Sequence, residues 1–143
     1  MTKKYYQNSL KFRVLSRIRR SRRLVVFRED LESMGSPRQI SRCLKDLAEM
    51  GELLKIGYGV YAKTYVSKNL KKPALKGGFE QVCKEVLARK GVQWEVGSAV
   101  KAYNAGLTTQ VPVRFIVTLK SRFRGQLSYG NQKLIIEGKV NAR

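Results

Sequence analysis

The sequence predicts an α+β protein in which a helix-rich first half is followed by a small α+β domain with an antiparallel sheet. In several segments apolar residues recur at steps of three and four, the spacing of one helix face. Short β-prone runs, some of them paired around glycine, lie between these segments and predict strands. The basic stretch at residues 67–78 contains a proline and ends in Gly-Gly. We therefore expect domains at residues 1–66 and 79–143, joined by a linker at 67–78.

The first predicted elements are a helix, a strand and a second, shorter helix. Residues 9–20 place four apolar side chains at helical spacing among basic ones, which predicts a basic amphipathic helix. The apolar run at residues 24–27 favours a short strand. Residues 28–34 are expected to form a two-turn helix that ends at Gly35 in a left-handed cap.

The segment at residues 36–50 carries the clearest local signal in the chain. Ser36 followed three residues later by Gln39 is a capping box, and Pro37 suits the first helical position. A helix should begin there and end before Gly51, with one apolar stripe formed by Ile40, Cys43, Leu44, Leu47 and Ala48.

A β-hairpin is expected directly after this helix. Two β-prone runs, residues 52–56 and 60–64, flank the glycine-bracketed tip at Tyr58. The order helix, strand, helix, helix, hairpin is that of a winged helix-turn-helix, with residues 36–50 as recognition helix and the hairpin as wing.

The second half is expected to form a helix, a strand, a short helix, a strand and a terminal hairpin. Their predicted ranges are 79–90, a short strand around Trp94, 98–105, 113–120, and the hairpin of 126–129 with 132–137. Aromatic side chains at helical or alternating spacing are normal core material, so we assign five to the core: Phe79, Trp94, Tyr103, Phe115 and Phe123.

Several classes of protein are disfavoured by the composition. The chain has no histidine and only two cysteines, Cys43 and Cys83, without CxxC spacing, which disfavours zinc sites and most catalytic dyads. Both thiols lie on apolar stripes and are expected to be buried and reduced. Without paired carboxylates we expect no enzyme, no cofactor and no metal. The absence of an apolar leader or a long apolar span predicts a cytoplasmic protein with no membrane partner.

Net charge is the strongest compositional feature. The formal charge is +20, and residues 1–70 and 71–143 each carry ten more basic than acidic side chains. Such a charge attracts polyanions, so nucleic acid is the leading partner class. An anionic membrane surface or an acidic protein would also be attracted to it.

Candidate binding residues follow from the predicted recognition helix and wing. Arginine can read guanine and glutamine adenine through paired hydrogen bonds, whereas a lysine more often meets phosphate. The helix offers Ser36, Arg38, Gln39, Arg42 and Lys45, with Ser36 serving as a cap or as a phosphate donor. The wing offers Lys55, Tyr58 and Lys63. An ordinary solvated face is the alternative interpretation of both sets.

Two further basic groups are predicted to contact partners. Phosphate contacts are expected from the arginine cluster at residues 17–23, which includes Arg19, with Arg17, Arg20, Arg22 and Arg23 as the named contact residues. The second half has a basic surface that could extend a DNA footprint, bind RNA or meet an acidic protein: Arg114, Lys120, Arg122, Arg124 and Lys133.

The segments Gln39-Ile40-Ser41-Arg42 and Gly51 to Ala62, together with Trp94-Glu95, Ala102 to Gly106 and Thr108 to Pro112, resemble AbiEi-type antitoxins of type IV toxin–antitoxin pairs. The resemblance implies a winged-helix regulator that represses its own operon and counteracts a nucleotidyltransferase-like toxin. Members of that group often continue beyond the last hairpin, so we expect the regulator function to transfer better than toxin neutralisation.

Three functions stay open at this level. The leading expectation is a transcriptional repressor that binds double-stranded operator DNA, as a monomer or a dimer, with a dimer on DNA favoured. The second is a non-specific DNA- or RNA-binding protein, and the third is an antitoxin acting mainly through protein contacts.

Overall fold

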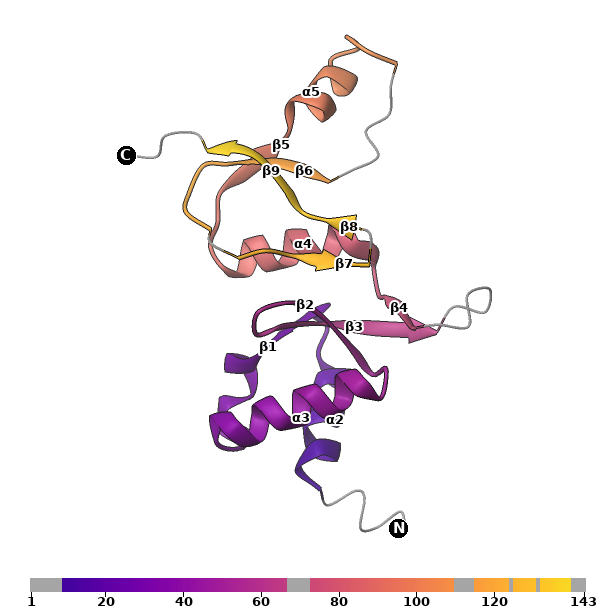
Figure 1. The fold of residues 1–143 in the computed structure, drawn as a ribbon, viewed down its shortest axis with the longest axis vertical. Coiled ribbons are helices and arrows are strands. Elements are labelled where there is room, and N and C mark those ends of the chain that lie inside the picture. The colour runs from indigo at the N-terminus through magenta and orange to yellow at the C-terminus, as the bar shows by residue number, and fades with distance from the viewer. Residues whose placement is uncertain (1–8, 67–72, 110–114, 124, 131, 140–143) are drawn as a thin grey trace. The chain divides into compact units, whose positions relative to one another are not determined.

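The computed structural model of the chain describes residues 9–66, 73–109, 115–123, 125–130 and 132–139 (Figure 1). It has α+β architecture and divides into two compact units, Met1–Gly78 and Phe79–Arg143. Each unit is described separately below.

The first unit follows the predicted order of elements. It contains α2 (Leu10–Arg20), β1 (Val25–Phe27), the 3₁₀ helix η1 (Arg28–Met34), α3 (Pro37–Glu49), β2 (Leu53–Gly57), β3 (Val60–Val66) and β4 (Pro73–Leu75). The amphipathic helix, the first strand, the capped helix and the hairpin are all confirmed.

One detail of the segment before α3 was predicted wrongly. Residues 28–34 form the expected short helix, as a 3₁₀ helix that ends one residue before Gly35, but Gly35 has an extended backbone, with φ of 177°, instead of the predicted left-handed cap. The segment starts where Asp30 Oδ2 accepts a hydrogen bond from the Phe27 N–H at 2.9 Å. The extended Gly35 leads the chain directly into Ser36, the N-cap of α3. A Cβ on Gly35 would lie 3.1 Å from Gln39 Oε1 and 3.3 Å from Leu10 Cδ2, so the chain passes close to both.

Strand β3 organises the sheet of the first unit. It pairs antiparallel with β1, β2 and β4. At Lys63 the backbone N–H donates to Leu24 O at 2.9 Å and the carbonyl accepts from Lys76 N at 3.0 Å. β1 and β4 therefore lie end to end along one edge of β3. This corrects the predicted linker, because residues 73–75 belong to the sheet and residues 67–72 lie outside the described residues.

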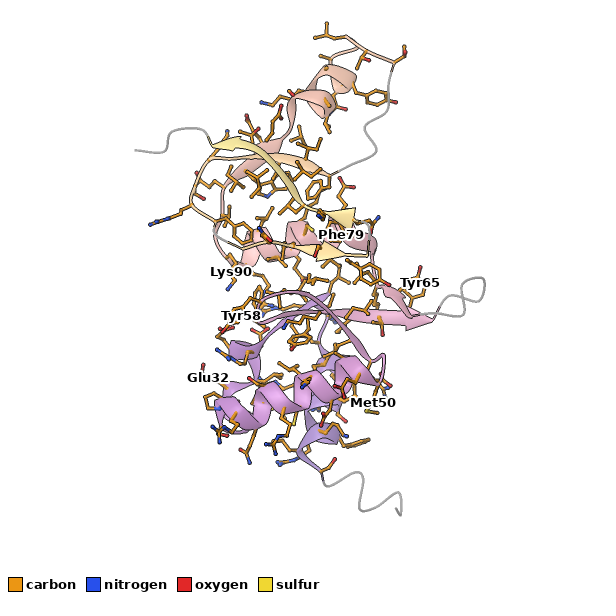
Figure 2. All side chains as sticks on the ribbon, in the orientation of Figure 1. Glu32, Met50, Tyr58, Tyr65, Phe79 and Lys90 are labelled. Carbon is orange, nitrogen blue, oxygen red and sulfur yellow. The ribbon has the colours of Figure 1, made fainter. Side chains whose placement is uncertain are left out.

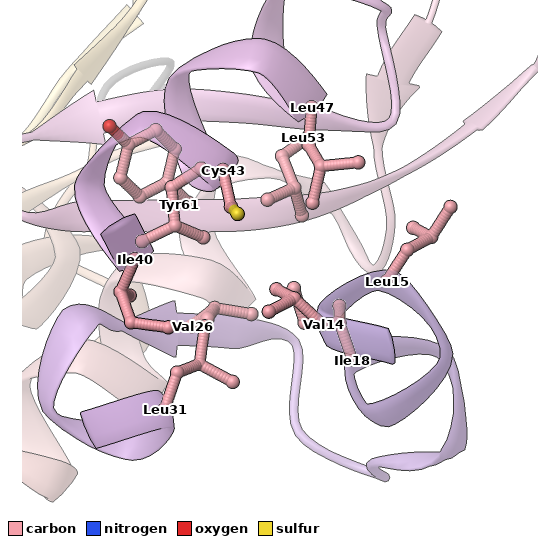
Figure 3. Close-up of a cluster of buried hydrophobic side chains, with 11 residues drawn as sticks. Val14, Leu15, Ile18, Val26, Leu31, Ile40, Cys43, Leu47, Leu53 and Tyr61 are labelled. Carbon is pink, nitrogen blue, oxygen red and sulfur yellow. The ribbon is translucent and has the colours of Figure 1, made fainter. Parts of the chain in front are cut away.

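The core of the first unit lies between α2, α3 and the sheet. Figure 3 shows the cluster, in which α2 and α3 face each other and the strands. Its buried members are Val14, Leu15, Ile18, Val26, Leu31, Ile40, Cys43, Leu44, Leu47, Leu53 and Tyr61. Because this cluster takes one face of α3, the helix is fixed with its opposite face toward solvent.

The second unit contains α4 (Gly78–Arg89), whose first residue closes the preceding unit, then β5 (Trp94–Val96), α5 (Ser98–Asn104), β6 (Ile116–Leu119), β7 (Ser128–Tyr129), β8 (Gln132–Lys133) and β9 (Ile135–Lys139). Its three-stranded sheet has the order β5-β6-β9. β5 pairs with β6 antiparallel, but β6 pairs with β9 in parallel.

The predicted antiparallel sheet is therefore wrong for β9. Parallel neighbours need a crossover of about a dozen residues or more, and residues 120–134, which include the small β7–β8 hairpin, provide it. The predicted terminal hairpin is thus shorter than expected, and residues 135–139 belong to another sheet. Of the predicted strand at 113–120, residues 113 and 114 lie outside the described residues.

The core of the second unit is smaller. Leu87, Val92, Val117 and Leu119 are buried, and Trp94, Phe115, Phe123 and Leu134 pack against them. The rings of Trp94 and Phe115 meet edge to face, with centroids 5.7 Å apart. Phe79 is also buried, so four of the five aromatic predictions hold at least in part.

Tyr103 is the exception, because it is 42% exposed on α5, a helix with no buried residue. The thiols of Cys43 and Cys83 are both free and buried, as predicted. Among the described residues no helix is both long and apolar enough to cross a membrane.

Candidate nucleic-acid interface

The N-terminus of α3 is held by reciprocal hydrogen bonds. Ser36 Oγ accepts from the Gln39 N–H at 3.2 Å, and Gln39 Oε1 accepts from the Ser36 N–H at 2.9 Å. This arrangement satisfies amide groups that would otherwise lack partners at a helix start. Two predicted site residues therefore have a structural role. One of the two lone pairs on the Gln39 side-chain oxygen is taken by the Ser36 N–H.

The face of α3 opposite the core carries a row of cations. Arg38, Arg42 and Lys45, which we call the α3 ridge, are exposed and follow one another at steps of four and three. This spacing places them on one side of the helix, about 180° from the buried stripe. Across the described ranges, no ion pair or side-chain hydrogen bond engages any of the three. Glu49 continues the same row one turn after Lys45 and is also exposed.

The β2–β3 hairpin presents an aromatic residue at its tip. Tyr58 is 91% exposed, and Gly59 follows it with φ of 66°, a left-handed conformation that glycine adopts without strain. Figure 2 shows Tyr58 at the hairpin end, on the other side of the unit from Met50 at the C-terminal end of α3. Lys55, on β2, is exposed as well.

Lys63 does not belong with this group, and its predicted wing contact is wrong. It is only 8% exposed, and its ammonium group donates to the Ser21 carbonyl at the C-terminal end of α2. Alternation along β3 places Lys63 on the same face as Tyr61, which packs in the core. A cation at a helix C-terminus is electrostatically favoured, so Lys63 acts as an internal cap.

Three of the four predicted phosphate-contact arginines have a partner on the protein surface. Arg17 Nη1 donates to Ser33 Oγ at 3.3 Å, and Arg20 Nε donates to a backbone carbonyl one turn earlier at 3.4 Å. Arg23 lies 4.0 Å from the Asp30 carboxylate, and Arg22 is exposed. Exposed contacts of this kind contribute little stability, so these side chains could still turn toward phosphate.

Two more arginines of α2 bear on this group: Arg19, which belongs to the predicted cluster, and Arg13, which the sequence analysis did not single out. Arg19 forms an ion pair with Glu52 at 2.9 Å. Arg13 is exposed one turn before Arg17, and the step of four in the sequence was the signal that could have identified it.

Of the five residues of the predicted basic surface in the second unit, the structure describes Lys120, Arg122 and Lys133. Lys120 is paired with Glu95 at 3.3 Å, and Lys101 lies 2.5 Å from the same carboxylate. Hydrogen bonds from these two lysines lower the pKa of Glu95. Arg122 and Lys133 are exposed, whereas Arg114 and Arg124 lie outside the described residues.

A second carboxylate in this unit has a structural role that the sequence did not indicate. Glu137 accepts hydrogen bonds from the hydroxyl of Ser98 and from its backbone N–H, the latter at 2.7 Å, so it holds the first turn of α5. These hydrogen bonds lower the pKa of Glu137. The two residues are 39 positions apart, so no local pattern pairs them.

No metal centre emerges from the described part of the chain. No group of three or more cysteine, aspartate or glutamate side chains is placed there to hold a metal ion. Burial raises the pKa of the Cys43 thiol and raises that of Cys83 to about 12, so both are unreactive near neutral pH. The exposed chemistry of the first unit is thus dominated by cations and one aromatic tip.

Comparison with known proteins gives a family match. Residues 13–136 match the family model DUF6088, which is described as a family of unknown function. No curated protein and no solved structure matches the chain significantly.

Proposed function

The chain belongs to the DUF6088 family, and we propose that its first unit is a winged helix-turn-helix that binds double-stranded DNA. In this interpretation η1 and α3 form the helix-turn-helix and β2–β3 is the wing. The observation that carries the proposal is the α3 ridge. A helix anchored by one face in the core presents unpaired cations from the other, which is how a recognition helix meets the major groove.

The proposed docking assigns a contact to each exposed group. Arg38 and Arg42 reach base edges, and Lys45 meets phosphate as a compact point charge. Lys55 and Tyr58 contact the backbone or the minor groove from the hairpin. The arginines of α2 and the following loop exchange their weak surface contacts for phosphates: Arg17, Arg20, Arg22 and Arg23.

The biological role that fits this binding mode is a cytoplasmic transcriptional regulator of the AbiEi antitoxin type. The resemblance of the chain to that group supports repression of its own operon, with a nucleotidyltransferase-like toxin as a further partner. In the second unit the exposed side chains of Arg122 and Lys133 would serve DNA or that partner.

A gel-shift experiment with the full-length protein tests the proposal. The probe is the duplex upstream of its own gene, in the presence of excess unrelated DNA. We expect a shifted complex that survives competition and is lost with Arg42→Ala, since this change removes the central cation of the α3 ridge.

Non-specific nucleic-acid binding is the second candidate, because each half of the chain is equally basic. In that case the affinity for nucleic acid would fall steeply as the salt concentration rises, and no DNA sequence would be preferred. Equal affinity for the upstream duplex and for unrelated duplexes would reject sequence-specific regulation in its favour.

A further inference from the structure

The geometry points to a particular class of DNA sequence: Arg38 and Arg42 each read a guanine, and the two guanines lie within two base steps of one another. This inference rests on the proposed function and refines it. It also departs from the expectation that Gln39 reads an adenine beside them.

Three arginines of the first unit outside α3 already have a partner on the protein surface. Arg19, Arg23 and Arg17 are held by Glu52, Asp30 and Ser33 respectively. These three arginines lie on α2 or in the loop that follows it, and none of them lies on α3. Arg38 and Arg42 have no such partner in the described part of the chain and lie on the helix face that is turned from the core.

Gln39 is withdrawn from readout by the capping box. Adenine recognition by glutamine needs the side-chain oxygen and nitrogen together, as acceptor and donor. The oxygen is engaged by the Ser36 N–H at 2.9 Å. Releasing it would leave an amide group at the helix start without its partner, so the bound state keeps the box and uses the arginines.

The chemistry of the remaining groups favours guanine. A guanidinium group donates two parallel hydrogen bonds to the O6 and N7 acceptors of guanine, the commonest specific contact in the major groove. Residues four apart on a helix are separated by about 6 Å along its axis. Successive bases are about 3.4 Å apart along each strand. Arg38 and Arg42 therefore reach bases no more than two steps apart.

Glu49 limits the contact to the part of α3 that precedes its last turn. Its exposed carboxylate continues the row of Arg38, Arg42 and Lys45 and would repel phosphate. The contact thus covers the N-terminal turns of the helix, on the side of the unit away from Met50 (Figure 2).

Selection of bound duplexes from a randomised library by the full-length protein tests the inference. We expect an enriched site with two guanines separated by at most one base pair. Arg42→Lys keeps the charge but removes the paired donors, so it should relax the preference at one guanine, and Arg38→Lys at the other. Replacing the specified guanine should weaken wild-type binding by between about 5-fold and 150-fold, and the matching lysine variant should lose most of that discrimination.

Arg19→Lys is the matched control, because it makes the same change at the arginine paired with Glu52. It should leave the selected site unchanged, as should Gln39→Ala. A selected site without guanines, or one whose guanine preference survives both Arg38→Lys and Arg42→Lys, would overturn the guanine assignment while leaving DNA binding intact. Recovery of no preferred site by the wild-type protein would instead overturn the proposed sequence-specific function itself.

Discussion

Replacing Ser36 with alanine should destabilise the first unit through the start of α3. The change removes the acceptor of the 3.2 Å bond from the Gln39 N–H but leaves the 2.9 Å bond from the Ser36 N–H to Gln39 Oε1. N-cap replacements of this kind cost about 0.5–2 kcal/mol. Because the cap is exposed and half of the capping box survives, we expect the free energy of unfolding to fall by about 1 kcal/mol.

Urea unfolding followed by far-UV circular dichroism measures this loss. With slopes of about 1–3 kcal/mol per molar urea, the midpoint should fall by about 0.3–1 M. Ser33→Ala is the matched control, because the Ser33 hydroxyl only accepts a 3.3 Å contact from exposed Arg17. It should change the stability by less than about 0.5 kcal/mol. Equal effects of the two substitutions would show that the capping box does not hold α3.

Three other predictions concern buried or paired groups. Lys63→Met leaves a carbonyl at the end of α2 without its donor, so the free energy of unfolding should fall by about 1–3 kcal/mol in urea titrations. Reduced DNA affinity with unchanged stability would instead place Lys63 on the wing. The pKa of Glu95 is lowered by its lysines, so its stabilisation is present above the ordinary value of 4.5 and is lost as the pH falls through the lowered pKa. Trp94 fluorescence should therefore report weakening of the second unit as the pH falls below 4.5, and Glu95→Gln should flatten that dependence; an unchanged pH profile would refute the role of this cluster. Finally, burial raises the pKa of Cys83 to about 12, so this thiol should react with a disulfide reagent at neutral pH only after unfolding. Rapid modification of Cys83 in the native protein would contradict the buried position.

Local sequence patterns were enough to predict α3 and its neighbours. The Ser36, Pro37 and Gln39 pattern fixes where the helix begins, and the apolar stripe fixes which face is buried. Once that face is assigned, the outward position of Arg38 and Arg42 follows from helix geometry alone.

Features that depend on distant pairing escaped sequence analysis. The parallel pairing of β9 with β6 and the addition of β4 to the first sheet are decided by which strands meet in space. Lys63 looked like a wing cation because the strand pattern does not show that its neighbour Tyr61 faces the core. Glu137 was missed because its partner Ser98 belongs to another element.

Fluorescence anisotropy with the labelled upstream duplex tests most directly whether the α3 ridge binds DNA. Arg42→Glu and Lys76→Glu change the net charge equally, but only Arg42 lies on the ridge, whereas Lys76 is exposed after β4. Non-specific attraction would fall similarly for both variants. We predict that Arg42→Glu weakens binding more than about tenfold beyond the loss seen with Lys76→Glu. An equal loss for the two variants would show that the total charge, and not the exposed face of α3, holds the DNA.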